Sequence, residues 1–173
     1  MNAKISELFD VLGSSTADMQ REIALSLSML LEHCACRKDS TQESILTADL
    51  LAIELSPPEC AELARRIQSA LSMTGLHRDA QITFVTALGK IKDPPSFRAI
   101  SKYVQAYYNV LSDEELYGVL VSLSSALLYK HPSPDILGIA REHQINGVVR
   151  QLSLRSSARL EEPLRRLRAA LEN

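Results

Sequence analysis

The chain has 173 residues, of which 46% are hydrophobic and 23% are charged, and both values are ordinary for a globular protein. A chain of this length can bury a substantial core, so long disordered stretches are not expected. It contains six Gly and no Trp. Because few Gly leave few positions for tight hairpin turns, an all-β sandwich or barrel is disfavoured. The net charge of −2 does not by itself indicate a partner.

Charge is unevenly distributed along the chain. Residues 1–60 contain four Lys/Arg and ten Asp/Glu, whereas residues 141–173 contain seven Arg and four acidic residues. The ordinary interpretation is a set of solvated helix faces linked by Glu–Arg pairs. The alternative is that one of the two ends meets a partner of opposite charge.

The first apolar residues and the cysteines indicate the cellular compartment in which the protein is expected. The first apolar residues, from Ile5 to Leu12, have helical spacing and do not form the apolar core of a secretory signal peptide. No apolar stretch approaches the roughly 18 residues needed to span a bilayer. The three Cys are an odd number, which does not fit a disulfide framework. We therefore expect a cytoplasmic protein that does not enter a membrane.

Helix starts recur along the chain. A capping residue followed by Pro precedes an apolar-periodic run at Ser56-Pro57, at Asp93-Pro94 and at Ser133-Pro134. The side-chain oxygen can accept a bond from a free backbone N–H, and Pro is tolerated at the first helical position. The spacings of 37 and 40 residues predict repeated helix pairs.

Capping boxes, in which a Ser precedes a Glu by three residues, mark further starts at Ser40, Ser56 and Ser112. Together with the apolar periodicity they predict a series of helices and no strand. The expected helices cover residues 2–12, 16–36, 41–54, 57–73, 78–91, 94–110, 113–130, 134–142, 145–153 and 162–172.

The expected helix over 113–130 has two apolar stripes. The first consists of Leu116, Val119, Leu120, Leu123 and Leu127. The second consists of Tyr117, Val121 and Leu128. Two stripes predict a helix packed on two sides, as in an inner element of a stack. The helix over 162–172 has the single narrow stripe of Leu164, Leu167 and Leu171, which is typical of a terminal cap with a polar outer face.

The segment from Val85 to Pro95, with the sequence VTALGKIKDPP, resembles the junction of HEAT-like (armadillo-type) helical repeats. In that family a second helix ends in Ala-Leu-Gly-x-Ile, and Asp-Pro starts the next helix. Gly89 would allow close helix packing, and Asp93 would cap the next helix. The resemblance implies an all-α fold. It would be a right-handed α-solenoid or superhelix of about four helix pairs with a terminal capping helix, in a single domain over residues 1–173.

The other expected junctions lack the Leu-Gly-x-Ile sequence. A compact, irregular helical bundle is therefore the structural alternative. Proteins of the HEAT-like superfamily are mostly binding scaffolds, so the resemblance implies a non-catalytic protein that binds a macromolecular partner through its helix pairs. A minority act on nucleic acid or on pigment cofactors, through residues that have no counterpart identified in this chain.

The tyrosines are the first candidate for partner binding. All five lie within 27 residues of one another: Tyr103, Tyr107, Tyr108, Tyr117 and Tyr129. Tyr provides a large, stiff contact area with a polar tip, and it is enriched at binding hot spots. Since Val104 and Leu111 also need the core, at least one of the first three Tyr should lie outside it. The alternative is that most of these rings are core aromatics with solvated hydroxyls.

Arginines near the end of the chain are the second candidate, namely Arg150, Arg155, Arg159, Arg165, Arg166 and Arg168. Arg binds carboxylates and phosphates through its planar fork. Nucleic acid is not expected, because Glu161 and Glu162 interrupt the set, no aromatic residue is interleaved and the whole chain is acidic. A protein partner is expected instead, and the residues assigned to it are Tyr103, Tyr107, Tyr108, Tyr117, Arg159 and Arg165.

A group of acidic residues in the first third of the chain, called the acidic front below, suggests an alternative function. It consists of Glu7, Asp10, Asp18, Glu22, Glu32, Asp39, Glu43 and Asp49. Complementary charge steers encounter and selects partners. A bacterial immunity protein, which neutralises a nuclease toxin, would use such a face against a basic partner.

We expect no metal, no cofactor and no catalytic residue. In His33-Cys34-Ala35-Cys36 the side chain of Cys34 would point about 100° away from the other two on a helix, and a second ligand pair at zinc-site spacing is missing. Nucleophile-elbow, phosphate-loop and dinucleotide-binding motifs are absent from the sequence. The four His lie near expected helix ends, where cationic His interacts favourably with the helix dipole. An enzyme or a nucleic-acid-binding module remains the less favoured alternative.

Overall fold

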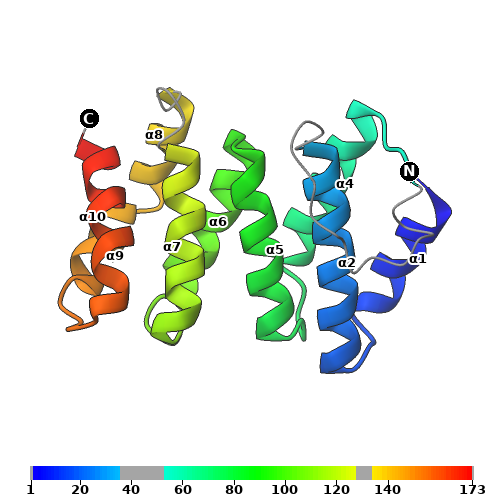
Figure 1. Cartoon of the computed structure of the whole chain (residues 1–173), viewed down its shortest axis with the longest axis horizontal. Coiled ribbons are helices and arrows are strands. Elements are labelled where there is room, and N and C mark those ends of the chain that lie inside the picture. The colour runs from blue at the N-terminus through cyan, green and yellow to red at the C-terminus, as the bar shows by residue number, and fades with distance from the viewer. Residues whose placement is uncertain (1, 36–52, 128–133, 173) are drawn as a thin grey trace. The chain divides into compact units, whose positions relative to one another are not determined.

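The computed structural model describes residues 2–35, 53–127 and 134–172. Over these residues the chain forms nine helices and no strand (Figure 1). They are α1 (Ala3–Leu12), α2 (Ala17–Ala35), α4 (Pro57–Ala70), α5 (Arg78–Ile91), α6 (Pro94–Tyr107), α7 (Asp113–Leu127), α8 (Pro134–Glu142), α9 (Ile145–Leu152) and α10 (Ala158–Glu172). The all-α prediction is confirmed for this part of the chain. The helix expected over 41–54 lies almost entirely outside it.

Local hydrogen bonds explain two of the helix starts. At the start of α7 the backbone N–H of Glu115 donates to the Ser112 hydroxyl at 3.3 Å, and the Ser112 N–H donates to the Glu115 carboxylate at 2.6 Å. At the start of α4 the Ser56 N–H donates to the Glu59 carboxylate at 3.1 Å. Both Glu belong to predicted capping boxes. The box expected at Ser40 lies outside the described ranges.

The segment from Val85 to Pro95 has the local contacts expected of Gly89 and Asp93. The Asp93 carboxylate accepts a bond from the Ser96 N–H at 2.8 Å, and α6 begins at Pro94. A Cβ atom added to Gly89 would lie 2.6 Å from Cβ of Ser122 on α7. This position therefore requires Gly because another helix lies directly against its backbone. Ile91, the last residue of α5, is half-buried.

Helix ends differ from the sequence-based expectation by a few residues. Helices α4 and α6 each end three residues earlier than predicted, and the predicted end of α7 at residue 130 lies outside the described residues. Helix α10 begins at Ala158, four residues before its predicted start, so Pro163 lies inside the helix and not in its first turn. Because Pro lacks an N–H, its place in α10 removes one backbone bond. The Pro163 ring is buried, and its burial offsets part of that loss.

The chain divides into two compact units, residues 1–87 and 88–173, and α5 contains the boundary. In the first unit α2 packs against α1 and α4. Its core includes Ile5, Leu12, Leu27, Leu30, Leu63, Ile67 and Phe84. The buried Gln20 side chain donates to the Gly75 carbonyl at 3.3 Å and accepts from the His77 N–H at 2.6 Å. These bonds fasten α2 to the segment that leads into α5.

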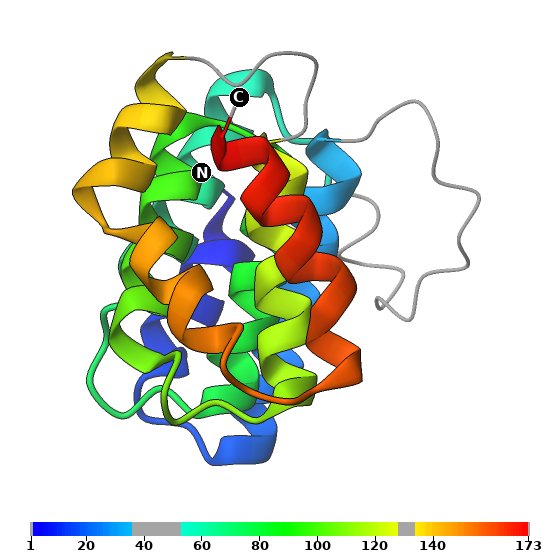
Figure 2. The same ribbon diagram turned by 90° about the vertical axis from the view of Figure 1, so that its left-hand side faces the viewer.

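In the second unit α7 and α10 lie side by side, as both views show (Figures 1 and 2). Helix α6 packs against α7, α8 and α9, and α9 also packs against α8 and α10. Its core includes Phe97, Ile100, Leu116, Leu120, Leu123, Ile145, Leu160 and Leu167. Packed helix pairs are thus present in this unit as predicted.

Two expectations about helix faces are wrong. The second stripe of α7 is not packed, because Tyr117 is 42% exposed and Val121 is 39% exposed, while Leu128 lies outside the described residues. Helices α6 and α10 both pack against α7. The buried stripe of α10 is also wider than predicted, since Leu160 and Pro163 belong to it.

In the part of the chain that the structure describes, no helix is both long enough and apolar enough to cross a membrane.

Candidate functional site

The outward face of α7 carries an exposed aromatic and aliphatic pair one helical turn apart, Tyr117 and Val121. The guanidinium carbon of Arg159, on the neighbouring α10, lies 5.3 Å from the centroid of the Tyr117 ring. Arg159 also forms an ion pair with Glu114, which precedes Tyr117 by three residues on α7. A guanidinium within about 6 Å of a ring centroid is attracted by the ring quadrupole. We call Glu114, Tyr117, Val121 and Arg159 the Tyr117 surface.

The other predicted tyrosines differ in how far their side chains are exposed. Tyr103 is 4% exposed and lies in the core of the second unit, so its ring is not available to a partner. Tyr107 is 37% exposed, with its ring centroid 4.9 Å from that of Tyr103. Tyr108 is half-buried at the end of α6. The prediction that at least one of these three lies outside the core is confirmed by Tyr107. Tyr129 falls outside the described residues.

Arg155 connects the loop between α9 and α10 to the loop between α6 and α7 in the second unit. Its guanidinium donates to the carbonyls of Tyr108 at 3.0 Å and Leu111 at 3.3 Å, and it lies 3.6 Å from the Asp113 carboxylate. The loop between α9 and α10 is thereby fastened to the loop between α6 and α7. These contacts support the packing of α7 against α10 and so hold the Tyr117 surface together.

Arg165, the remaining predicted contact residue, does not join the Tyr117 surface. It follows Arg159 by six residues on α10, so the two side chains leave the helix about 120° apart. Its guanidinium donates to the Glu162 carboxylate at 2.8 and 2.9 Å, and Arg166 donates to the same carboxylate at 2.6 Å. These two hydrogen-bonded guanidiniums lower the pKa of Glu162, with the larger effect from Arg165.

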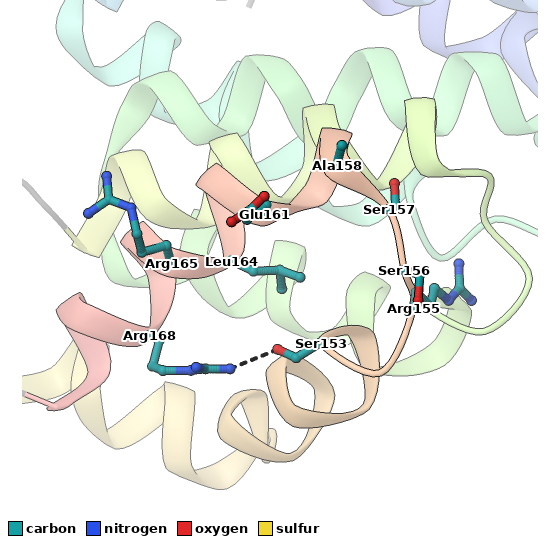
Figure 3. Close-up of a pocket in the computed structure, with 9 residues that line it drawn as sticks. All are labelled: Ser153, Arg155, Ser156, Ser157, Ala158, Glu161, Leu164, Arg165 and Arg168. Atoms are coloured by element: carbon teal, nitrogen blue, oxygen red, sulfur yellow. Dashed lines mark hydrogen bonds between the residues drawn. The ribbon is translucent and has the colours of Figure 1, made fainter.

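A pocket of about 550 Å³ opens between the α9–α10 loop and α10 (Figure 3). The loop contributes residues 153 and 155–157, and α10 contributes Ala158, Glu161, Leu164, Arg165 and Arg168. The Arg168 guanidinium donates to the Ser153 hydroxyl at 2.8 Å. Arg168 belongs to the predicted arginine set, whereas the serines of the pocket were not predicted. The available signal was the Ser156-Ser157 pair that directly precedes α10.

The residues of the acidic front that can be placed belong to the first unit. Glu7, Asp10, Asp18 and Glu22 are exposed on α1 and α2, and Glu32 is half-buried. The other three acidic residues of that set, Asp39, Glu43 and Asp49, lie outside the described residues.

Metal-binding chemistry has no site in the described ranges, where no three His, Cys, Asp or Glu side chains come together to hold an ion. Cys34 and Cys60 are half-buried, and Cys36 falls outside those ranges. Of the four His, His33 and His77 are exposed, and His131 is not described.

His143 differs from the expectation of a cationic residue at a helix end. It is 7% exposed between α8 and α9, and its Nδ1 lies 3.2 Å from the side-chain oxygen of Gln105. Burial lowers the pKa of His143, and the nearby Arg98 and Lys102 lower it further, against an opposing effect of Glu142. At neutral pH this imidazole is therefore an uncharged core group.

Comparisons with protein-family models, with curated proteins and with solved structures found no match for this chain. A functional assignment must therefore come from the residues and contacts of the chain itself. Among the predicted contact residues, Tyr117 and Arg159 are brought together on an exposed face, whereas Tyr103 is buried and Arg165 points elsewhere.

Proposed function

We propose that this protein is a non-catalytic interaction scaffold and that the Tyr117 surface contacts its protein partner. The observation that carries the proposal is the Arg159 guanidinium over the exposed Tyr117 ring, next to the exposed Val121. Tyr and Arg are among the residue types enriched at binding hot spots. An exposed apolar pair with charged neighbours also has the composition of an interface centre with a polar rim.

The surface is prepared for binding by its internal contacts. Arg159 is held between the Tyr117 ring and the Glu114 carboxylate, so its long side chain is already ordered. Ordering a flexible side chain at an interface costs roughly 0.5–1.5 kcal/mol, and a side chain that is ordered beforehand avoids much of that loss. The partner is expected to cover Tyr117 and Val121 with apolar side chains and to place polar groups near Glu114 and Arg159.

We further infer that the helix pairs form a HEAT-like solenoid. Support comes from the junction around Gly89 and Asp93, where Ser122 of α7 approaches Gly89 closely and the Asp93 side chain caps α6. Small-angle X-ray scattering of the full chain tests the inference. A solenoid predicts an elongated particle, and a particle as compact as a globular bundle of 173 residues would contradict it.

The experiment for the binding role is affinity capture from the native host with paired variants. Tyr117→Ala and Val121→Ala are expected to reduce the captured partner, because both shorten side chains at the centre of the proposed contact. Val11→Ala is the matched control, since Val11 is an exposed valine (46%) on α1 in the other unit. Undiminished capture by both α7 variants, with folding intact, would remove the Tyr117 surface from the proposal.

A further inference from the structure

The His143 ring connects the corner between α8 and α9 to α6. Its Nδ1 lies 3.2 Å from the side-chain oxygen of Gln105, so the neutral ring donates its proton there. Nε2 is then the unprotonated nitrogen of the ring. It is buried and has no hydrogen-bond partner in the described part of the chain. Because an enclosed acceptor without a donor is costly, a change that gives Nε2 a partner would alter this contact.

The Glu142 carboxylate lies near that nitrogen but bonds to another helix. Its Oε1 atom is 3.8 Å from Nε2 of His143, which is beyond hydrogen-bond distance. Both carboxylate oxygens accept from Nη1 of Arg98 on α6, at 2.8 and 2.6 Å. The end of α8 is thus held on α6 by this ion pair and by the bond from His143 to Gln105. The Glu142 side chain is 53% exposed, so it has room to turn from one partner to the other.

A proton on the ring would change the charge balance at this contact. The charged groups that act on His143 are Glu142 at the end of α8 and Arg98 and Lys102 on α6. Arg150, the charged residue of α9, is exposed and does not act on the ring. A cationic imidazole would therefore face two further cations, with one carboxylate among them.

The backbone of the α8–α9 corner depends on the contacts around it. Gln144 has a φ of 51°, a left-handed conformation that residues with a Cβ adopt rarely and keep only where neighbouring contacts fix it. Helix α8 has nine residues. A helix this short is stable only through its tertiary contacts. Loss of the polar contacts to α6 would therefore allow α8 to open while the rest of the unit stays folded.

We propose that acid releases α8 from α6 because Glu142 changes its partner from Arg98 to the protonated His143 ring. Nε2 takes up a proton from solvent, and the new N–H donates to the Glu142 carboxylate. Arg98 then loses its carboxylate, and the remaining positive charges repel one another across the contact. Burial and the two cations lower the pKa of His143, so the change occurs on the acid side of the usual His range.

Native-state hydrogen exchange of the full chain, read by NMR at pH 7 and pH 5, tests the proposal. The protection factors of the α8 amides should fall about fivefold or more between these pH values. They should also change little in low urea, because opening α8 exposes far less surface than global unfolding does. In His143→Gln the fall should be less than about twofold, since Gln has no proton to gain in this range. Either an equal fall in His143→Gln or α8 exchange as sensitive to urea as that of α7 would overturn the proposal.

Arg98→Gln and Lys102→Gln form a matched pair that keeps the test decisive if His143→Gln fails to fold. Arg98→Gln should lower α8 protection about threefold at pH 7, because it removes the ion pair to Glu142. It should also raise the pKa of His143, followed by the NMR signal of the ring, because a cation is lost and the carboxylate is freed. Lys102→Gln makes the same change in charge at an exposed residue and should leave α8 protection within about twofold. Equal effects of the two variants on protection, or an unchanged His143 titration in Arg98→Gln, would reject the exchange of partners.

Discussion

Arg159 and Tyr117 join α10 to α7 on the solvent side of the second unit, with the guanidinium carbon 5.3 Å from the ring centroid. The same guanidinium forms an ion pair with Glu114, so one side chain on α10 contacts two residues of α7. The two helices are therefore linked at their exposed edges as well as through their buried faces. Exposed contacts of this kind contribute little to stability, which leaves them available for recognition.

The first prediction separates the two roles of tyrosine in this region. Tyr103→Ala should lower the free energy of unfolding by about 3 kcal/mol or more, because it leaves a cavity where a 4% exposed ring was packed. Tyr117→Ala should lower it by less than about 1 kcal/mol, because that ring is largely solvated. Urea denaturation of both variants measures the difference. Similar losses for the two would show that Tyr117 is a core residue in solution.

The second prediction concerns two glycines in neighbouring helices. Gly89→Ala should destabilise the protein by about 1–3 kcal/mol, because the new Cβ would lie 2.6 Å from the Ser122 Cβ and 2.8 Å from its Cα. Gly118→Ala should stabilise it by about 0.5–1 kcal/mol, since nothing lies within 4 Å of the added atom and Ala is the better helix former. Thermal unfolding of the two variants shows whether each is less or more stable than the unmodified protein. Stabilisation by Gly89→Ala would contradict the close approach of α5 and α7.

The third prediction is a pH dependence caused by His143. Its pKa is lowered in the folded protein, mainly by burial, so the unfolded chain takes up a proton at a higher pH than the folded chain does. Stability from this group is therefore complete above about pH 6.5, the ordinary pKa of His, and is lost as the pH falls through and below that value. Urea denaturation between pH 8 and pH 5 should show a loss that is smaller in His143→Gln.

His77→Gln is the control for that measurement, because His77 is exposed. The decline of stability with falling pH should be the same in His77→Gln as in the unmodified protein. If the stability of His143→Gln fell with pH as much as that of the unmodified protein, the pH dependence would have to come from other groups.

The fourth prediction tests the cap at the start of α6. Asp93→Ala should cost about 1 kcal/mol of unfolding free energy, because the Ser96 N–H loses its acceptor at 2.8 Å. Asp93→Asn should cost much less, since Asn caps helices about as well as Asp does. Guanidinium denaturation of the two variants distinguishes them, and equal losses would indicate that the charge of Asp93 matters more than its capping bond.

The fifth prediction distinguishes the proposed contact from the acidic front. The charges of Glu114 and Arg159 compensate each other, so association through the Tyr117 surface should depend only weakly on ionic strength. Association of a basic partner with the exposed Glu7, Asp10 and Asp18 would slow steeply as salt is added. Stopped-flow measurement of the association rate from low to physiological salt decides between them, and a steep decline would favour the acidic front.

Helix starts could be predicted from the sequence because their hydrogen bonds are local. The capping pair of Ser112 and Glu115 spans three residues, and so does the bond from Ser96 to Asp93. The position of Pro163 could not be placed correctly by the same reasoning. A Pro is typical of a first helical turn, yet here burial of its ring and packing of Leu160 against the core extend α10 one turn further back.

By itself, the sequence determined an all-α chain, most of its helix starts and the clustering of tyrosines and arginines near one another, because these depend on periodicity and on residues a few positions apart. Only the tertiary structure decided which of those side chains are exposed and can therefore contact a partner. Tyr103 and Tyr117 belong to the same sequence cluster, but one is enclosed in the core and the other is exposed beneath Arg159. That difference depends on which helices pack against each ring, and those neighbours lie far away along the chain.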